Sequence, residues 1–176
     1  MKDLSVSSGK ANLIAVPIAF FSVLVFTIPY IHFWNTQSIK EILSSPFLKL
    51  QIYIPALLLG IFLHEIIHAA AFVFIAKVSK NNVTFGFQRK TITPYVHCKV
   101  PVKVSFYRTT LLAPGLLLGI IPALFSVVSG QGWLLIYACI FLIGAGGDFL
   151  IIWLLRKTGK NELVQDHPTR CGCIII

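Results

Sequence analysis

Acidic residues are scarce in this sequence: Asp and Glu together number 6 of 176 residues, against 15 Lys and Arg. Charged residues of both signs make up only 12% of the chain, whereas hydrophobic residues make up 56%. A water-soluble domain of this length could not hide so much apolar surface, because much of the surface of a small protein faces solvent. The composition therefore excludes an ordinary soluble domain and favours a chain whose solvent is lipid.

Several other features are missing. The four cysteines include no Cys-x-x-Cys pair, which argues against a structural zinc site built from thiolates, and Cys171 and Cys173 are too close for an ordinary disulfide framework. We expect reduced thiols. No small-residue cleavage site follows the first apolar segment, so we expect this segment to be retained as a membrane span. The length suits a single domain, residues 1–176.

Four apolar segments are long enough to span a bilayer, which takes about 20 helical residues. They run over about residues 11–33, 52–76, 110–129 and 133–155. The sequence thus predicts an all-α integral membrane protein with four transmembrane helices.

Basic residues are concentrated in the second connection and the tail. The connection carries Lys77, Lys80, Arg89, Lys90, Lys99, Lys103 and Arg108 with no acidic residue. A net charge of +9 could suggest nucleic acid as a partner. In a membrane chain, however, such an excess marks cytoplasmic loops that contact the lipid bilayer, and we expect no nucleic acid. The positive-inside rule then predicts that both termini and this loop are cytoplasmic.

The second connection also shows strand-like alternation. Val83, Phe85 and Phe87 alternate with more polar residues, and so do Val100, Val102 and Val104. Such patterns predict a small β-hairpin or sheet at the cytoplasmic face, between spans two and three. The alternative is an irregular basic loop.

The residues that carry chemistry lie inside the second apolar segment, in His64-Glu65-Ile66-Ile67-His68. This spacing puts both imidazoles on one face of a helix, close enough to bind one metal ion. Glu65 is expected to act as a general base on metal-activated water rather than as a ligand. This is the HExxH signature of zinc metallopeptidases. The alternative is a polar cluster that holds helices together, but ionisable residues at membrane depth rarely lack a function.

A catalytic zinc usually has three protein ligands and one open position. Asp148 is the only other acid within the apolar segments, and it lies about as far from Arg156 as His68 lies from Lys77, so both residues should share one depth. The glycines of Gly144-Ala145-Gly146-Gly147 should let span four approach span two. Asp148 could instead be a second acid that hydrogen-bonds a ligand histidine.

Other candidates for the third ligand lie outside the membrane segments. They are His97 in the basic loop and the Asp166-His167 pair in the tail. Pro168 and Gly172 mark a turn there, which Asp166 could cap. Asp166 could also fold back to the mouth of the site, as a supporting or substrate-contacting residue.

These residues resemble the DUF3267 family of zincin peptidases, small bacterial membrane proteins. The resemblance rests on His64–His68 with Ala69, Leu112-Ala113-Pro114, Gly147-Asp148, and Asp166-His167-Pro168 with Gly172. More distantly, the arrangement is similar to site-2 proteases, which take an aspartate from a later helix as the third zinc ligand. The aspartate motif of those proteases is usually Leu-Asp-Gly, whereas the corresponding residues here are Gly147-Asp148-Phe149. The resemblance implies peptidase activity and a bacterial cell membrane.

The sequence therefore favours a membrane-embedded zinc peptidase that acts on a peptide or membrane-protein substrate. His64, His68 and Asp148 are the expected zinc ligands, and Glu65 is the expected base. The alternative is a non-enzymatic membrane adaptor or transporter subunit that keeps the metal as a structural element. A closed four-ligand site would favour this alternative, and an open three-ligand site the enzyme.

Overall fold

The computed structural model describes residues 2–34, 39–88 and 93–176. Arg89 and Lys90, two of the charges in the basic connection, lie outside these residues. The chain is mostly helical. Its main helices are α1 (Ser8–Trp34), α2 (Ile39–Ser44), α3 (Leu50–Phe74), α4 (Val104–Pro114), the π-helix η4 (Gly115–Ile120), α5 (Ile121–Ser129), α6 (Gly132–Gly144) and α7 (Gly146–Leu154).

Within these described residues, three helices are long and apolar enough to cross a membrane: Gly9–Trp34, Leu50–Phe74 and Val104–Ser129. The fourth predicted span is a bent pair, Gly132–Gly144 and Gly146–Lys157, whose axes differ by 44°. The segments predicted as spans are therefore helical, with up to four spans if the bent pair counts as one. The sequence did not predict the bend.

The outward faces of these helices are strongly apolar. Phe20, Phe62 and Phe125 are 63%, 59% and 60% exposed, and many other large aliphatic side chains on the same helices are exposed too. Contiguous apolar surface of this extent is rare on soluble monomers, because it is costly in water. The exposed faces fit a lipid environment.

In the part of the chain that the structure describes, six strands form two small sheets. The hairpin of β2 (Val83–Gln88) and β3 (Thr93–Cys98) is antiparallel, with Phe85 opposite Val96. The second sheet has the order β1-β6-β5-β4 and joins the two ends of the chain. Its strands are β1 (Lys2–Val6), β4 (Val102–Lys103), β5 (Leu163–Asp166) and β6 (Cys171–Ile175).

The predicted strand over Val100–Val104 is largely wrong. Only Val102 and Lys103 pair, and their partner is the tail strand β5 rather than β2. Val104 already begins α4, and its N–H donates to the Glu162 carbonyl. The alternation of valines reflects burial rather than a hairpin, because Val102 and Val104 lie in a core shared with the tail. The terminal strands β1 and β6 were also not predicted.

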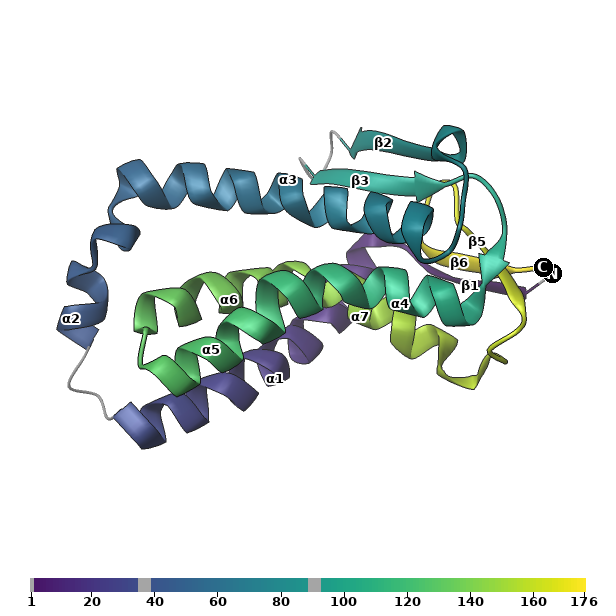
Figure 1. The fold of residues 1–176 in the computed structure, drawn as a ribbon. Helices are drawn as coiled ribbons and strands as arrows, with labels where there is room; N and C mark the ends of the chain where they lie inside the picture. The colour runs from purple at the N-terminus through teal and green to yellow at the C-terminus, as the bar shows by residue number, and fades with distance from the viewer. Residues whose placement is uncertain (1, 35–38, 89–92) are drawn as a thin grey trace.

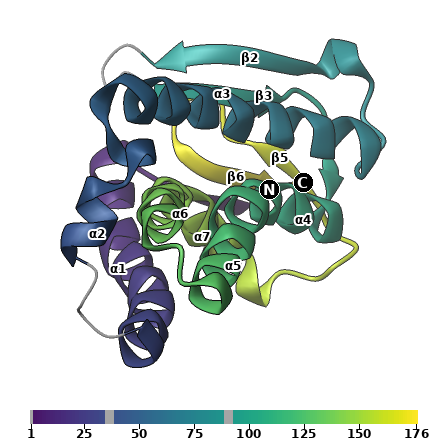
Figure 2. The same ribbon diagram turned by 60° about the vertical axis from the view of Figure 1, so that its left-hand side comes forward.

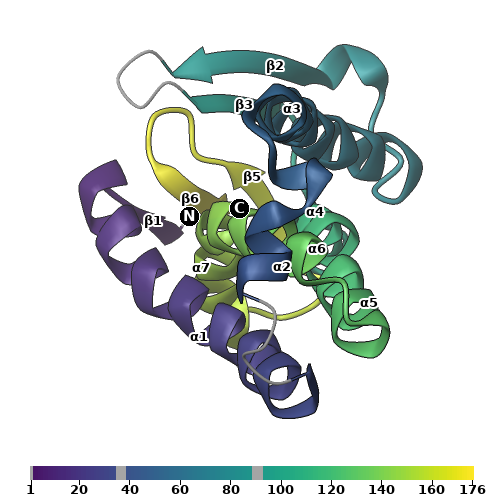
Figure 3. The same cartoon turned by 90° about the vertical axis from the view of Figure 1, so that its left-hand side faces the viewer.

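Both sheets and both chain ends lie at the same end of the helices (Figure 1). The β2–β3 hairpin runs beside the C-terminal half of α3, as the turned views show (Figures 2 and 3). Helix α4 packs against both α3 and α7, and α7 also packs against α1. Helix α4 therefore holds α3 and α7 at a fixed separation, and this sets the geometry of the site.

Candidate metal centre

Helix α3 presents the two histidines on one face, as their spacing requires. The ring centroids of His64 and His68 lie 4.9 Å apart. His68 is buried, at 7% exposure. Since α3 is unbroken over this stretch, the two rings are held on one rigid element.

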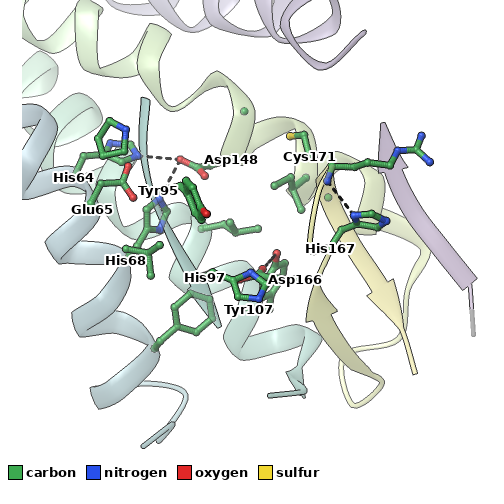
Figure 4. A pocket seen from close by; sticks show the side chains of 18 of the residues that line it. His64, Glu65, His68, Tyr95, His97, Tyr107, Asp148, Asp166, His167 and Cys171 are labelled. Atoms are coloured by element: carbon green, nitrogen blue, oxygen red, sulfur yellow. Dashed lines mark hydrogen bonds and ion pairs between the residues drawn. The ribbon is translucent and has the colours of Figure 1, made fainter. Parts of the chain in front are cut away.

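Asp148 lies in the first turn of α7, just after the bend at Ala145. Its Oδ2 atom is 3.2 Å from His64 Nε2 and 3.4 Å from His68 Nε2 (Figure 4). The ligand atoms of these three residues all lie within 4.8 Å of one another. The structure thus brings together three side chains from two helices, of which His64 and Asp148 are 84 residues apart.

A buried hydrogen bond orients His68. Its Nδ1 atom lies 3.1 Å from the carbonyl oxygen of Thr110 on α4. A carbonyl can only accept, so the proton of a neutral His68 sits on Nδ1 and its lone pair sits on Nε2, facing the carboxylate of Asp148. Two acceptors that face each other at this distance repel unless a proton or a metal ion lies between them. The donor set therefore fits a zinc ion, which two imidazoles and a carboxylate commonly bind.

Glu65 lies outside this three-residue group but beside it. Its side chain lines the same cavity, and its carboxylate lies near the backbone N–H of Val96 on β3. Because Glu65 adjoins His64 on the helix, the carboxylate stays next to the candidate ligands without completing their set.

A cavity of about 580 Å³ opens onto these residues. Gly144 and Gly147 line it, and a Cβ added to either would meet nothing within 4 Å. The expectation that these glycines bring span four against span two is therefore wrong. Gly146 faces Ala15 and Ala19 of α1 instead, whereas Gly144 and Gly147 leave open space beside Asp148.

Asp166 folds back to the cavity rather than only capping the tail turn. Its carboxylate accepts the backbone N–H of Cys98 at 2.7 Å and the hydroxyl of Tyr107, and His97 Nδ1 lies 3.7 Å away. Burial raises the pKa of Asp166, and the two hydrogen bonds oppose that rise. Asp166 thereby ties the tail to strand β3 and helix α4.

The remaining candidates from the sequence lie around or away from this centre. His97, His167 and Cys171 line the cavity but are outside the three-residue group. His167 Nδ1 accepts the backbone N–H groups of Thr169 and Arg170, so this histidine organises the tail turn. Cys173 is fully buried, and burial raises its pKa to about 12, which keeps the thiol protonated.

Comparison with protein families matches residues 57–163 to DUF3267, described as "Putative zincin peptidase". The chain belongs to this family. The match confirms the resemblance inferred from the motifs and covers α3 from residue 57 onward, α4, α7 and the strands between them. Searches of curated proteins and of solved structures find no match.

Sequence reasoning missed three groups at the site: the Thr110 carbonyl, the Val96 N–H and the Tyr107 hydroxyl. Two of these are main-chain groups, which every residue carries, so no residue type could have marked them. Little in the sequence assigned Tyr107 to the site, because tyrosine is common at the membrane interface, where helices begin.

Proposed function

We propose that this protein is a membrane-embedded, zinc-dependent peptidase that hydrolyses peptide bonds in or near the membrane, with Glu65 as the general base. The observation that carries the proposal is the convergence of His64 Nε2, His68 Nε2 and Asp148 Oδ2 beside Glu65 in one cavity. Membership of a family described as zincin peptidases supports the reaction class. The long apolar helices support the membrane setting.

His64, His68 and Asp148 would hold the zinc ion, and a zinc ion bound there would supply Lewis-acid polarisation of the scissile carbonyl and of the attacking water at neutral pH. The Glu65 carboxylate takes a proton from the attacking water and passes it to the nitrogen of the leaving amine. The Val96 N–H lies beside that carboxylate on the side of β3. Asp148 has no role in proton transfer here, because its Oδ2 faces both imidazoles.

The proposed substrate is an extended segment of a peptide or membrane protein. The cavity volume, about 580 Å³, is within the usual range for ligand sites, and strand β3 forms one of its walls. A strand can hold an extended chain through main-chain hydrogen bonds, and proteolysis needs an unwound backbone. Since the β2–β3 hairpin belongs to the basic connection, cleavage would occur toward the cytoplasmic side.

The proposal is tested by comparing membrane proteomes of cells that carry the wild-type protein with those that carry Glu65→Gln. If the protein is a peptidase, at least one membrane protein should be cut in wild-type cells and remain uncut in cells that carry the variant. Purified wild-type protein should then cleave that protein in detergent, and a chelator should stop the reaction. Identical proteomes, together with no cleavage by the zinc-loaded protein, would contradict the proposal.

The alternative is a non-enzymatic adaptor or transporter subunit that binds metal as a structural element. Such sites are usually closed by four protein ligands. Within the described residues, the group around Asp148 contains three such side chains, and a cavity adjoins it. An open position beside a candidate base favours the peptidase.

A further inference from the structure

The carbonyl of Thr110 lacks the partner that a helix normally provides. In an α-helix it would accept the N–H four residues later, but that residue is Pro114, which has none. The next N–H along the chain, that of Gly115, donates to the Leu112 carbonyl. The partner recorded for the Thr110 carbonyl is Nδ1 of His68, at 3.1 Å.

Proline does more than remove a donor. Its ring clashes with the carbonyl four residues earlier and turns that oxygen outward from the helix axis. Thr110 and Pro114 are both buried, and α4 packs against α3, so the freed oxygen meets a protein group rather than water. A buried carbonyl with no donor would be costly, as would an unpaired imidazole N–H. Each group satisfies the other.

We propose that Pro114 is a positioning residue of the metal centre. By leaving the Thr110 carbonyl without a helical donor, it fixes the proton of His68 on Nδ1 and directs the lone pair of Nε2 toward the position that His64 and Asp148 share. The inference rests on the proposed metal site. The side chain of Thr110 is not involved, because its hydroxyl donates to the Phe106 carbonyl.

Pro114 also lies at a packed contact, and this is the competing explanation for any effect of its loss. The π-helix η4 begins at the next residue, Gly115, and a Cβ there would press on Phe149 and Ala145 of span four. A test must therefore separate the hydrogen bond from the packing. Gly115→Ala disturbs the packing and leaves residue 114 without an N–H. Pro122→Ala restores an N–H to another proline of the same span, away from the site.

The test uses the full-length protein in detergent and measures two properties of the metal centre. Zn²⁺ affinity is measured by competition with a chelator, and the visible absorption spectrum is recorded with Co²⁺ in place of zinc. Pro114→Ala restores a helical donor that competes for the Thr110 carbonyl. We expect about a tenfold loss of Zn²⁺ affinity, at the lower end of the range for outer partners of metal ligands, and a changed Co²⁺ spectrum. Thermal stability should not fall, since alanine favours helix.

The controls decide between the outcomes. Pro122→Ala should match the wild type in both measurements. Wild-type affinity and spectrum in Pro114→Ala would overturn the proposal, and so would an equal change of affinity and spectrum in Gly115→Ala. The double variant His64→Ala, His68→Ala tests the metal site itself: if it keeps Zn²⁺, the proposed function fails, whereas a failure confined to Pro114→Ala removes only this inference.

Discussion

Glu65 and Asp148 are carboxylates in one cavity with different surroundings. Oδ2 of Asp148 faces two imidazole nitrogens, whereas Glu65 meets the main chain of β3 and the open side of the cavity. A metal ligand needs fixed geometry, and a general base needs access to water and substrate. The two environments support the different roles proposed for these residues.

Glu65→Gln should bind zinc as the wild type does, about one ion per chain, and lose activity by roughly a hundredfold or more. Glutamine has nearly the same shape but cannot accept a proton at neutral pH. Metal analysis and the cleavage rate of a verified substrate measure the two effects. Undiminished cleavage would mean that Glu65 is not the base.

Asp148→Asn should weaken zinc binding strongly, because it removes a charged ligand. The loss of affinity should exceed the roughly 10–100-fold that is typical when a residue that hydrogen-bonds to a metal ligand is replaced. Asp166→Asn is the matched control, since an amide oxygen can still accept the Cys98 N–H. Its zinc affinity should stay at the wild-type value in the chelator assay. The reverse pattern would make the tail, rather than span four, the source of the third ligand.

Asp166 should also give a pH dependence to stability. Burial raises its pKa above the ordinary 3.8, so its contribution to the free energy of unfolding is complete below pH 3.8 and is lost as the pH rises through the raised pKa. The titratable groups that interact with it are His97, Tyr107, His68, Cys98 and Cys173. Relative to Asp166→Asn, the metal-free wild type should therefore lose stability as the pH rises above 3.8 in denaturant titrations. A constant difference would contradict this reading.

At the scale of elements, strand β6 contains a glycine, Gly172, whose role the sequence alone did not show. Gly172 lies opposite Ser5 of β1 with φ +134°, and a Cβ there would collide with the Leu4 carbonyl. Only glycine adopts this conformation without strain at such close approach. The glycine that resembles the family pattern therefore joins the two ends of the chain.

Gly172→Ala should destabilise the terminal sheet by about 1–3 kcal/mol, the usual cost of a residue forced into a sparsely populated backbone region. Thermal unfolding measures the global effect, and alkylation of the buried Cys173 thiol reports local opening. Gly9→Ala in α1 is the control, since a Cβ there meets nothing within 4 Å. Equal alkylation rates in both variants would show that Gly172 is not needed for this pairing.

At the scale of the molecule, chain ends, sheets and site share one end of the helices (Figure 1). An even number of spans requires the termini to lie on the same side, which agrees with the pairing of β1 and β6. The excess of positive charge on that side favours the cytoplasm.

Orientation is tested in intact cells by adding one exposed cysteine at a time to the wild-type chain. Asn81→Cys, before β2, should resist a membrane-impermeant thiol reagent, whereas Lys49→Cys, at the opposite end before α3, should react. The wild-type protein is the background control: Cys98 and Cys173 are buried, and any labelling of the partly buried Cys139 and Cys171 is subtracted. Labelling of Asn81→Cys from outside would reverse the proposed topology.

The sequence by itself determined the features that depend on local pattern. Apolar length marked the helices, the spacing of His64 and His68 put both on one helix face, and alternation marked β2. Each of these follows from the geometry of a single element, which a few neighbouring residues specify.

Only the tertiary structure decided which distant groups meet. It placed Asp148, rather than Asp166 or His97, beside the two imidazoles, and it turned the valines before α4 toward the tail instead of into a hairpin. It also supplied the Thr110 carbonyl to His68. These contacts join segments far apart in the chain, and they depend on how helices and strands pack. Local periodicity records which face of an element is apolar or polar, but not which distant element that face will meet.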